Sequence, residues 1–124
     1  MLIQLGDCLE EGGSQFLKQI SKNLNLKIND DYKYIRKNED VFKGEKIKEK
    51  DIVLNYLTSF NKPTFATTGR VKDNVENVVI ETKCDNGYDD GIYYWDETDI
   101  YHFKKYNMPL KQEFIDYVLN KWIN

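Results

Sequence analysis

The stretch from Cys84 to Lys105 constrains the fold more than any other part of the chain, because turns, a strand and a helix start follow one another closely there. Asp-Asn-Gly at 85–87 and Asp-Gly at 90–91 predict turns, since Asn and Gly tolerate the positive φ that tight turns need. The bulky run Ile92–Trp95 predicts a short strand. An aspartate suited to N-capping follows at once, with a second acid in the next turn, and this pattern predicts a helix over 97–106.

The rest of the chain adds elements that together predict a single α+β domain over residues 1–124. Apolar residues at helical spacing and runs of strand-forming residues give the expected boundaries. We expect helices over about 15–24, 48–60 and from Pro109 onward, and strands near 64–71, 76–82 and 91–95. Short polar connections favour a small antiparallel sheet of three to four strands, covered by N-terminal helices and a C-terminal helix.

Negative charge is concentrated in the same stretch. Six acids and no lysine or arginine lie between Asp85 and Asp99, a local formal charge of −6 in a chain of net charge −3, which leaves +3 for the rest. A surface of one sign attracts partners of the opposite sign, and the aromatic residues between the acids are typical anchors of protein interfaces. The candidate partner-binding residues are Asp85, Tyr88, Asp89, Asp90, Tyr93, Trp95, Asp96, Glu97 and Asp99.

An ordinary structural explanation of this stretch stays open beside the binding one. Acids are favoured in solvated turns and in the first turn of a helix, where they face unpaired N–H groups. Tyrosine rings can equally lie at the edge of a core with the hydroxyl in water. The binding hypothesis therefore requires that the acids and the rings share one exposed surface.

The composition argues against nucleic acid and membranes as direct partners. The chain is mildly acidic, and the basic residues between Lys27 and Lys50 alternate with acids, so that this segment nets only +2. No apolar run approaches the ~20 residues of a membrane span, and the N-terminus lacks the basic flank of a signal peptide. Cys8 and Cys84 form neither a C-x-x-C motif nor a zinc pattern. We expect two reduced thiols in a cytoplasmic protein, with a single disulfide left open.

No motif predicts a bound metal or a cofactor. An EF-hand loop begun at Asp85 places Gly91 at position 7, where the loop requires glycine at position 6, and Asp96 at position 12, where it requires glutamate. No glycine-rich loop has the spacing that cradles phosphate. Gly69 next to Arg70 predicts a β-bulge that aims Arg70 outward, toward an anion or toward one of the turn acids.

No motif predicts catalysis either. His102 is the only histidine, and Asp99 lies one helical turn before it, as in an ordinary pair on a helix surface. A catalytic pair of His102 with Cys84 is the nucleophilic arrangement that the sequence offers. We therefore expect no enzymatic activity.

Part of the C-terminal third resembles a known class of proteins. The segments 90–103, 106–110 and 113–119, which begin with Asp-Gly-Ile-Tyr-Tyr-Trp-Asp-Glu-Thr-Asp, look like the C-terminal half of small bacterial immunity proteins of polymorphic and contact-dependent toxin systems. The resemblance implies tight, non-catalytic capture of one cognate toxin, often a basic nuclease blocked by an acidic face. It implies no particular fold and no residue roles, because this class is structurally diverse.

The acidic aromatic stretch and the resemblance together lead to one functional expectation. We expect an immunity or inhibitor protein that binds and neutralises a basic toxin, such as a nuclease, through the region 85–101. The alternative is a small-ligand module, bacterial or phage-encoded, that holds an anionic metabolite or a nucleotide with Arg70 and the aromatic rings. A third hypothesis is an enzyme built on His102. The oligomeric state follows from none of these observations.

Overall fold

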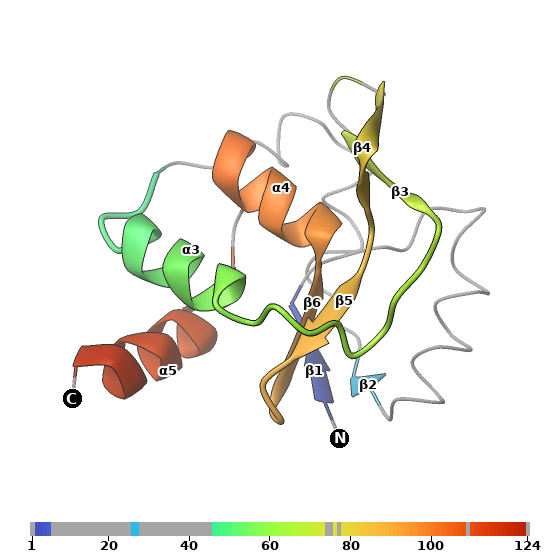
Figure 1. Ribbon diagram of the computed structural model, residues 1–124. Helices are drawn as coiled ribbons and strands as arrows, with labels where there is room; N and C mark the ends of the chain where they lie inside the picture. Colours follow the sequence, from blue (N-terminus) through green and yellow to red (C-terminus); the bar gives the residue numbers. More distant parts are fainter. Residues whose placement is uncertain are drawn as a thin grey trace.

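The computed structural model describes residues 2–5, 26–27, 46–73, 76, 78–108 and 110–123, and it confirms the α+β class expected from the sequence. The helix expected over 15–24 and Cys8 lie outside the described residues. The described elements follow the chain in the order β1 (Leu2–Gln4), β2 (Leu26–Lys27), α3 (Lys50–Thr58), β3 (Arg70–Asp73), β4 (Val78–Cys84), β5 (Gly87–Asp89), β6 (Tyr93–Asp96), α4 (Glu97–Tyr106) and α5 (Gln112–Ile123) (Figure 1).

The described strands form two separate sheets. β2, β1, β6 and β5 make a mixed four-stranded sheet in that order, in which β1 runs parallel to both β2 and β6. β5 and β6 form an antiparallel hairpin, and β3 and β4 form a second, two-stranded antiparallel sheet. The antiparallel pairing expected for the strands near 64–71 and 76–82 is found between β3 and β4, but β3 overlaps only the end of the expected 64–71. The strand expected near 91–95 belongs to the mixed sheet.

The N-terminal strand accounts for this difference. Ile3 N donates to Ile92 O and Leu5 N donates to Tyr94 O, both at 2.8 Å, so β1 occupies the edge of β6 that a third antiparallel strand would need. The Leu5 side chain is fully buried. Pairing with β6 thus satisfies the backbone groups of this short segment and buries an apolar side chain at the same time.

An irregularity in the β3–β4 pair lies where the sequence predicted a bulge. The register shifts between Arg70 and Val71, directly after Gly69. Arg70 is exposed as expected, but its guanidinium donates to Thr68 O at 3.0 Å and to Cys84 Sγ at 2.8 Å. These neighbours replace the turn acid that we expected as its partner.

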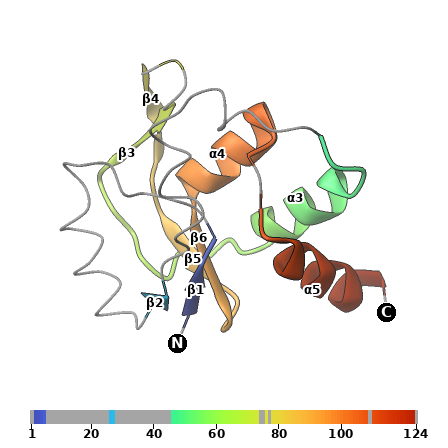
Figure 2. The same ribbon diagram turned by 180° about the vertical axis from the view of Figure 1, so that it is seen from behind.

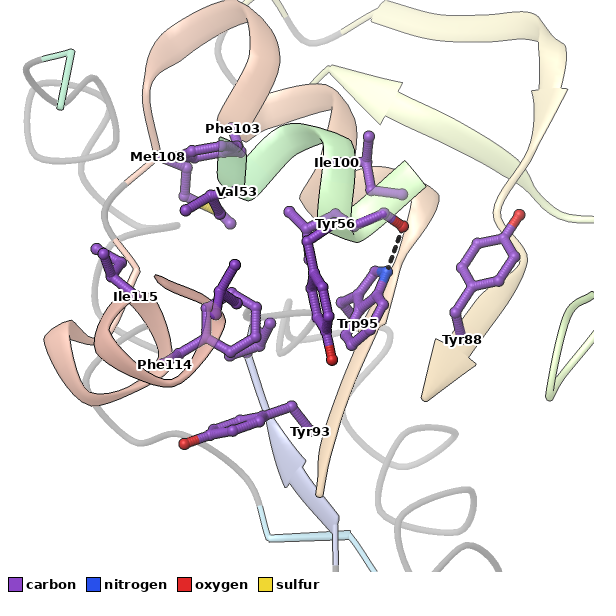
Figure 3. Close-up of a cluster of buried hydrophobic side chains, with 13 residues drawn as sticks. Val53, Tyr56, Tyr88, Tyr93, Trp95, Ile100, Phe103, Met108, Phe114 and Ile115 are labelled. Carbon is purple, nitrogen blue, oxygen red and sulfur yellow. Dashed lines mark hydrogen bonds between the residues drawn. The ribbon is translucent and has the colours of Figure 1, made fainter. Parts of the chain in front are cut away.

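Trp95 of β6 lies at the centre of the core, between the mixed sheet and the helices. Figures 1 and 2 show α3, α4 and α5 together on one side of β5 and β6. The Trp95 ring is fully buried and packs against the rings of Tyr56, Phe60 and Phe114, at centroid distances of 6.0, 5.2 and 6.4 Å. Its indole Nε1 donates to Leu57 O at 3.3 Å, which fastens α3 to the sheet (Figure 3).

Capping decides the bounds of the helix that follows β6. α4 has the predicted bounds because Asp96 and Asp99 form a capping box, in which each carboxylate accepts from the backbone N–H of the other, at 2.8 and 3.0 Å. Asn107, in the left-handed conformation with a φ of 57°, ends the helix. α5 begins at Gln112 and not at Pro109, where the sequence signal placed its first residue.

Gly87 sits where a side chain would collide with the core. A Cβ built on Gly87 lies 2.6 Å from Cζ of the buried Tyr94 ring and closer still to the hydroxyl oxygen. We expect Gly87→Ala to lower the free energy of unfolding by about 1–3 kcal/mol, the usual effect of overpacking a core. Urea unfolding followed by circular dichroism measures the change.

Gly69→Ala is the matched control for this substitution. A Cβ at Gly69 meets nothing closer than Thr67 Oγ1 at 3.4 Å, which is ordinary contact. We expect its effect to stay within about 0.5 kcal/mol, as for most surface substitutions. Equal losses in the two variants would contradict the prediction.

Candidate functional site

The nine predicted partner-binding residues do not form a shared exposed surface. Five of them are buried, with at most 7% of the residue exposed: Tyr88, Tyr93, Trp95, Asp96 and Asp99. The other four are partly buried: Asp85, Asp89, Asp90 and Glu97. Side chains this deeply buried cannot together present the exposed surface that the hypothesis requires. The expectation of an exposed acidic aromatic surface over 85–101 is therefore corrected for the five buried residues.

The aromatic residues are buried because β6 is covered on both faces. Successive side chains of a strand point to opposite faces, and all four residues of β6 are buried. The Tyr93 ring packs edge-on against Phe114 of α5 at a centroid distance of 4.9 Å and lies 5.4 Å from the Tyr117 ring. The one open face that we expected from the sequence suits a solvated antiparallel sheet, and not a central strand of a mixed sheet whose residues are all buried.

The half-buried acids of the β5–β6 hairpin hold its turn together. Asp90 accepts from the backbone N–H groups of Ile92 and Tyr93 at 2.9 and 2.6 Å, and from the Tyr56 hydroxyl at 2.5 Å. Asp89 accepts from the backbone N–H two residues further on, at 2.9 Å. These bonds agree with the structural explanation that the sequence left open, in which the acids serve the turn.

Three further acids surround the first turn of α4. Asp85 Oδ1 accepts from Thr98 N at 3.0 Å, and Asp96 and Asp99 make the reciprocal bonds of the capping box. The free N–H groups and the positive end of the dipole at a helix N-terminus both attract carboxylates. The acidity of this segment is thus explained by the helix that it starts.

Burial makes Asp99 a weaker acid than an exposed aspartate. Desolvation of its carboxyl group, together with the nearby charge of Asp96, raises the pKa of Asp99 well above the ordinary value. The backbone hydrogen bond that the carboxyl accepts from Asp96 lowers the pKa but does not outweigh burial. Folding therefore makes the Asp99 carboxyl harder to ionise than it is in the unfolded chain.

We expect Asp99→Asn to stabilise the fold at neutral pH. A carboxyl whose pKa is raised by folding contributes its full stability below about pH 4, and this contribution is lost as the pH rises through the raised pKa. The asparagine does not titrate, and its amide oxygen can still accept from Asp96 N. The free energy of unfolding of the variant should rise relative to wild type between pH 4 and pH 7, by roughly 1.4 kcal/mol for each unit of pKa shift.

Urea titrations at a series of pH values measure this difference. Asp116→Asn is the control, because it makes the same change of side chain at an exposed position on α5 and should leave the free energy of unfolding within about 0.5 kcal/mol of wild type. An Asp99→Asn variant that is less stable than wild type at pH 7 would contradict the predicted sign.

His102 lies inside the core. Its ring is fully buried, with Nδ1 2.7 Å from Thr98 O, and it stacks on the Tyr106 ring at a centroid distance of 5.9 Å. Asp99, which we expected to pair with it on the helix surface, is buried as well. Cys84 is a free thiol on β4. A substrate could reach the His102 imidazole only if α4 moved away from the sheet.

In the part of the chain that the structure describes, no three His, Cys, Asp or Glu side chains are grouped so as to hold a metal ion. None of the helices in the described ranges combines the length and the apolar character that crossing a bilayer requires.

A groove of about 950 Å3 opens between α3 and α4. Leu57 and Ile100 form its buried floor, with 1% and 6% of each residue exposed. Its aromatic lining and its polar or charged rim comprise Phe60, Tyr88, Tyr101, Asn55, Thr58, Asn61, Lys83, Glu97, Lys104 and Lys105. Only Tyr88 and Glu97 among these belong to the predicted set.

The sequence could not reveal the groove, because its walls come from helices that are distant in the chain. A local signal exists only on α4, where Glu97, Tyr101, Lys104 and Lys105 recur at helical spacing and so share one face. That pattern is also typical of a plain solvated helix face, and it points to a site only once α3 is placed opposite.

Buried Asp73 fixes the α4 wall of the groove to β3. Its Oδ2 accepts from the hydroxyls of Tyr101 and Tyr106 at 2.7 and 2.6 Å and lies 3.4 Å from Lys105 Nζ. Lys105 Nζ also donates to the Tyr101 hydroxyl at 3.2 Å. The hydrogen bond with Tyr101, and with it the bond to Asp73, raises the pKa of Lys105, so this ammonium stays charged at ordinary pH.

Comparisons with models of known protein families, with curated protein sequences and with solved structures found no significant match. We therefore infer function from the geometry of the groove and from the charges around it.

Proposed function

We propose that this chain is a non-catalytic immunity or inhibitor protein of the cytoplasm, which neutralises a toxin by binding it in the groove between α3 and α4. One observation carries the proposal: the groove joins a buried apolar floor to an exposed polar rim. This combination is typical of the centre of a protein interface, where an apolar anchor is surrounded by polar contacts. The resemblance of the segments 90–103, 106–110 and 113–119 to immunity proteins supports the class of partner.

The groove takes the place of the acidic aromatic surface expected from the sequence. Most rings of that stretch are needed in the core, and its carboxylates are engaged in turns and caps, so neither set is free to anchor a partner. The groove, by contrast, has exposed side chains on its rim, among them Asn55, Thr58 and Asn61. These amides and this hydroxyl can form the polar contacts that fix the register of a bound partner.

The groove is preformed because α3 is tied both to α4 and to the sheet. At the rim, Lys50 Nζ from the start of α3 donates to Lys104 O and to Asn107 Oδ1 at the end of α4, both at 2.7 Å. Beneath the floor, the Trp95 indole holds Leu57 O. A rigid site loses little conformational entropy on binding, which favours the tight capture that an inhibitor needs.

The test is complex formation with the protein encoded by the neighbouring toxin gene. We expect a one-to-one complex by size-exclusion chromatography with light scattering, and a dissociation constant measurable by calorimetry. Asn55→Trp fills the groove from the exposed surface of α3 and should weaken binding by about tenfold or more, as for loss of an interface hot spot.

Gln112→Trp is the matched control, since it places the same side chain on the exposed start of α5, outside the groove. It should bind as wild type does. Absence of any complex would overturn the proposed function, and wild-type affinity of Asn55→Trp would exclude the groove as the contact surface.

A further inference from the structure

The charges around the groove are not balanced. Among the described residues, the lining carries three ammonium groups and one carboxylate, so that Lys83, Lys104 and Lys105 against Glu97 leave a formal charge of +2. Asp73 lies behind the lining, on Lys105, and reduces this to +1. The groove is therefore cationic, although the chain as a whole is acidic.

Two of the three ammonium groups have partners. Lys105 is held by Asp73 and the Tyr101 hydroxyl, as described above. Lys83 Nζ lies 3.9 Å from one oxygen of Glu97, and the other oxygen of that carboxylate accepts from the Tyr88 hydroxyl at 2.6 Å. Glu97 is thus engaged on both oxygens and offers little to a cationic ligand.

Lys104 carries the unbalanced charge. Its side chain is exposed, and within the described residues no carboxylate lies within 4.0 Å of its ammonium group. Its backbone is fixed, because Lys104 O accepts from Lys50 Nζ. Lys104 follows Ile100 and Tyr101 by one helical turn, so its ammonium rises from the same face of α4 as the apolar floor and an aromatic wall.

Resting on the proposed function, we propose that the groove recognises an anionic group attached to a flat apolar body, with Lys104 as the residue that binds the anion. The apolar body lies on Leu57 and Ile100 between the aromatic walls, where burial of its surface supplies most of the affinity. The anion meets the ammonium of Lys104, which forms no ion pair with any described carboxylate. In a protein partner, an aspartate or glutamate supplies the anion and a neighbouring aromatic side chain supplies the flat apolar body. The partner's contact segment is then acidic. The sequence alone had suggested a basic partner.

A matched pair of dyes tests this chemistry without the partner. Anilinonaphthalene sulfonate carries an anion on a flat apolar body, and phenylnaphthylamine is the same body without the sulfonate. Fluorescence titrations should give tighter binding of the sulfonate, and raised salt should weaken it. Lys104→Gln should weaken sulfonate binding by about two- to fivefold, the range expected for a partly screened ion pair, and should leave binding of the neutral dye unchanged.

Two further variants make the result specific. Lys48→Gln removes the same charge from a side chain that is 91% exposed and does not line the groove, so it should bind both dyes as wild type does. Lys104→Arg keeps the charge and should retain sulfonate binding. Equal affinity for the two dyes, or equal effects of Lys104→Gln and Lys48→Gln, would overturn the inference.

Failure of this inference can be told apart from failure of the proposed function. If the toxin complex forms and Asn55→Trp disrupts it while the dyes show no preference for the anion, the groove is the contact surface but its charge is not used. If the dyes behave as expected but the toxin does not displace the sulfonate, the groove binds anions as inferred. The proposal that the toxin binds in the groove is then wrong. Displacement by a free nucleotide would instead identify a small anion as the source of the same chemistry.

Discussion

The direct passage from β6 into α4 at Asp96 is the constraint on which the rest of the structure depends. Asp96 is at once the last residue of the strand and the N-cap of the helix, so no loop separates the two elements. The reciprocal bonds of Asp96 and Asp99, with Asp85 on the N–H of Thr98, satisfy the free donors of a helix end that is buried. This junction sets the direction of α4 and, with it, one wall of the groove.

The same junction explains why the acidic stretch does not coincide with the groove that we propose as the binding site. Carboxylates gather at the start of α4 because buried N–H groups need acceptors, and they gather at the β5–β6 turn for the same reason. The carboxylates in these turns and caps are therefore occupied by bonds within the fold. Polar side chains without such a structural role lie on the facing surfaces of α3 and α4, where we propose that a partner binds.

Local signals made the local structure predictable. The capping aspartates gave the bounds of α4, the apolar stripe placed α3 within the expected 48–60, and the glycine at 69 marked the irregularity before Val71. The predictions that failed concerned contacts between parts of the chain that are far apart in sequence. Strand periodicity does not say which strand pairs with which, so the parallel insertion of β1 and the burial of both faces of β6 could not be foreseen. The groove could not be predicted for the same reason, because it forms where two helices that are distant in sequence lie next to each other.

The division between a fixed frame and a free rim has a consequence for how this protein can change over time. Trp95, Leu57 and the capping bonds between Asp96 and Asp99 are buried in the fold, whereas the side chains of Asn55, Asn61 and Lys104 are exposed. Substitutions at the rim can therefore accumulate at small cost in stability, since surface changes away from such features usually stay within about 0.5 kcal/mol. Under the proposed function, one scaffold of this kind can give rise to many proteins with different rims, each specific for a different partner, without a change of fold.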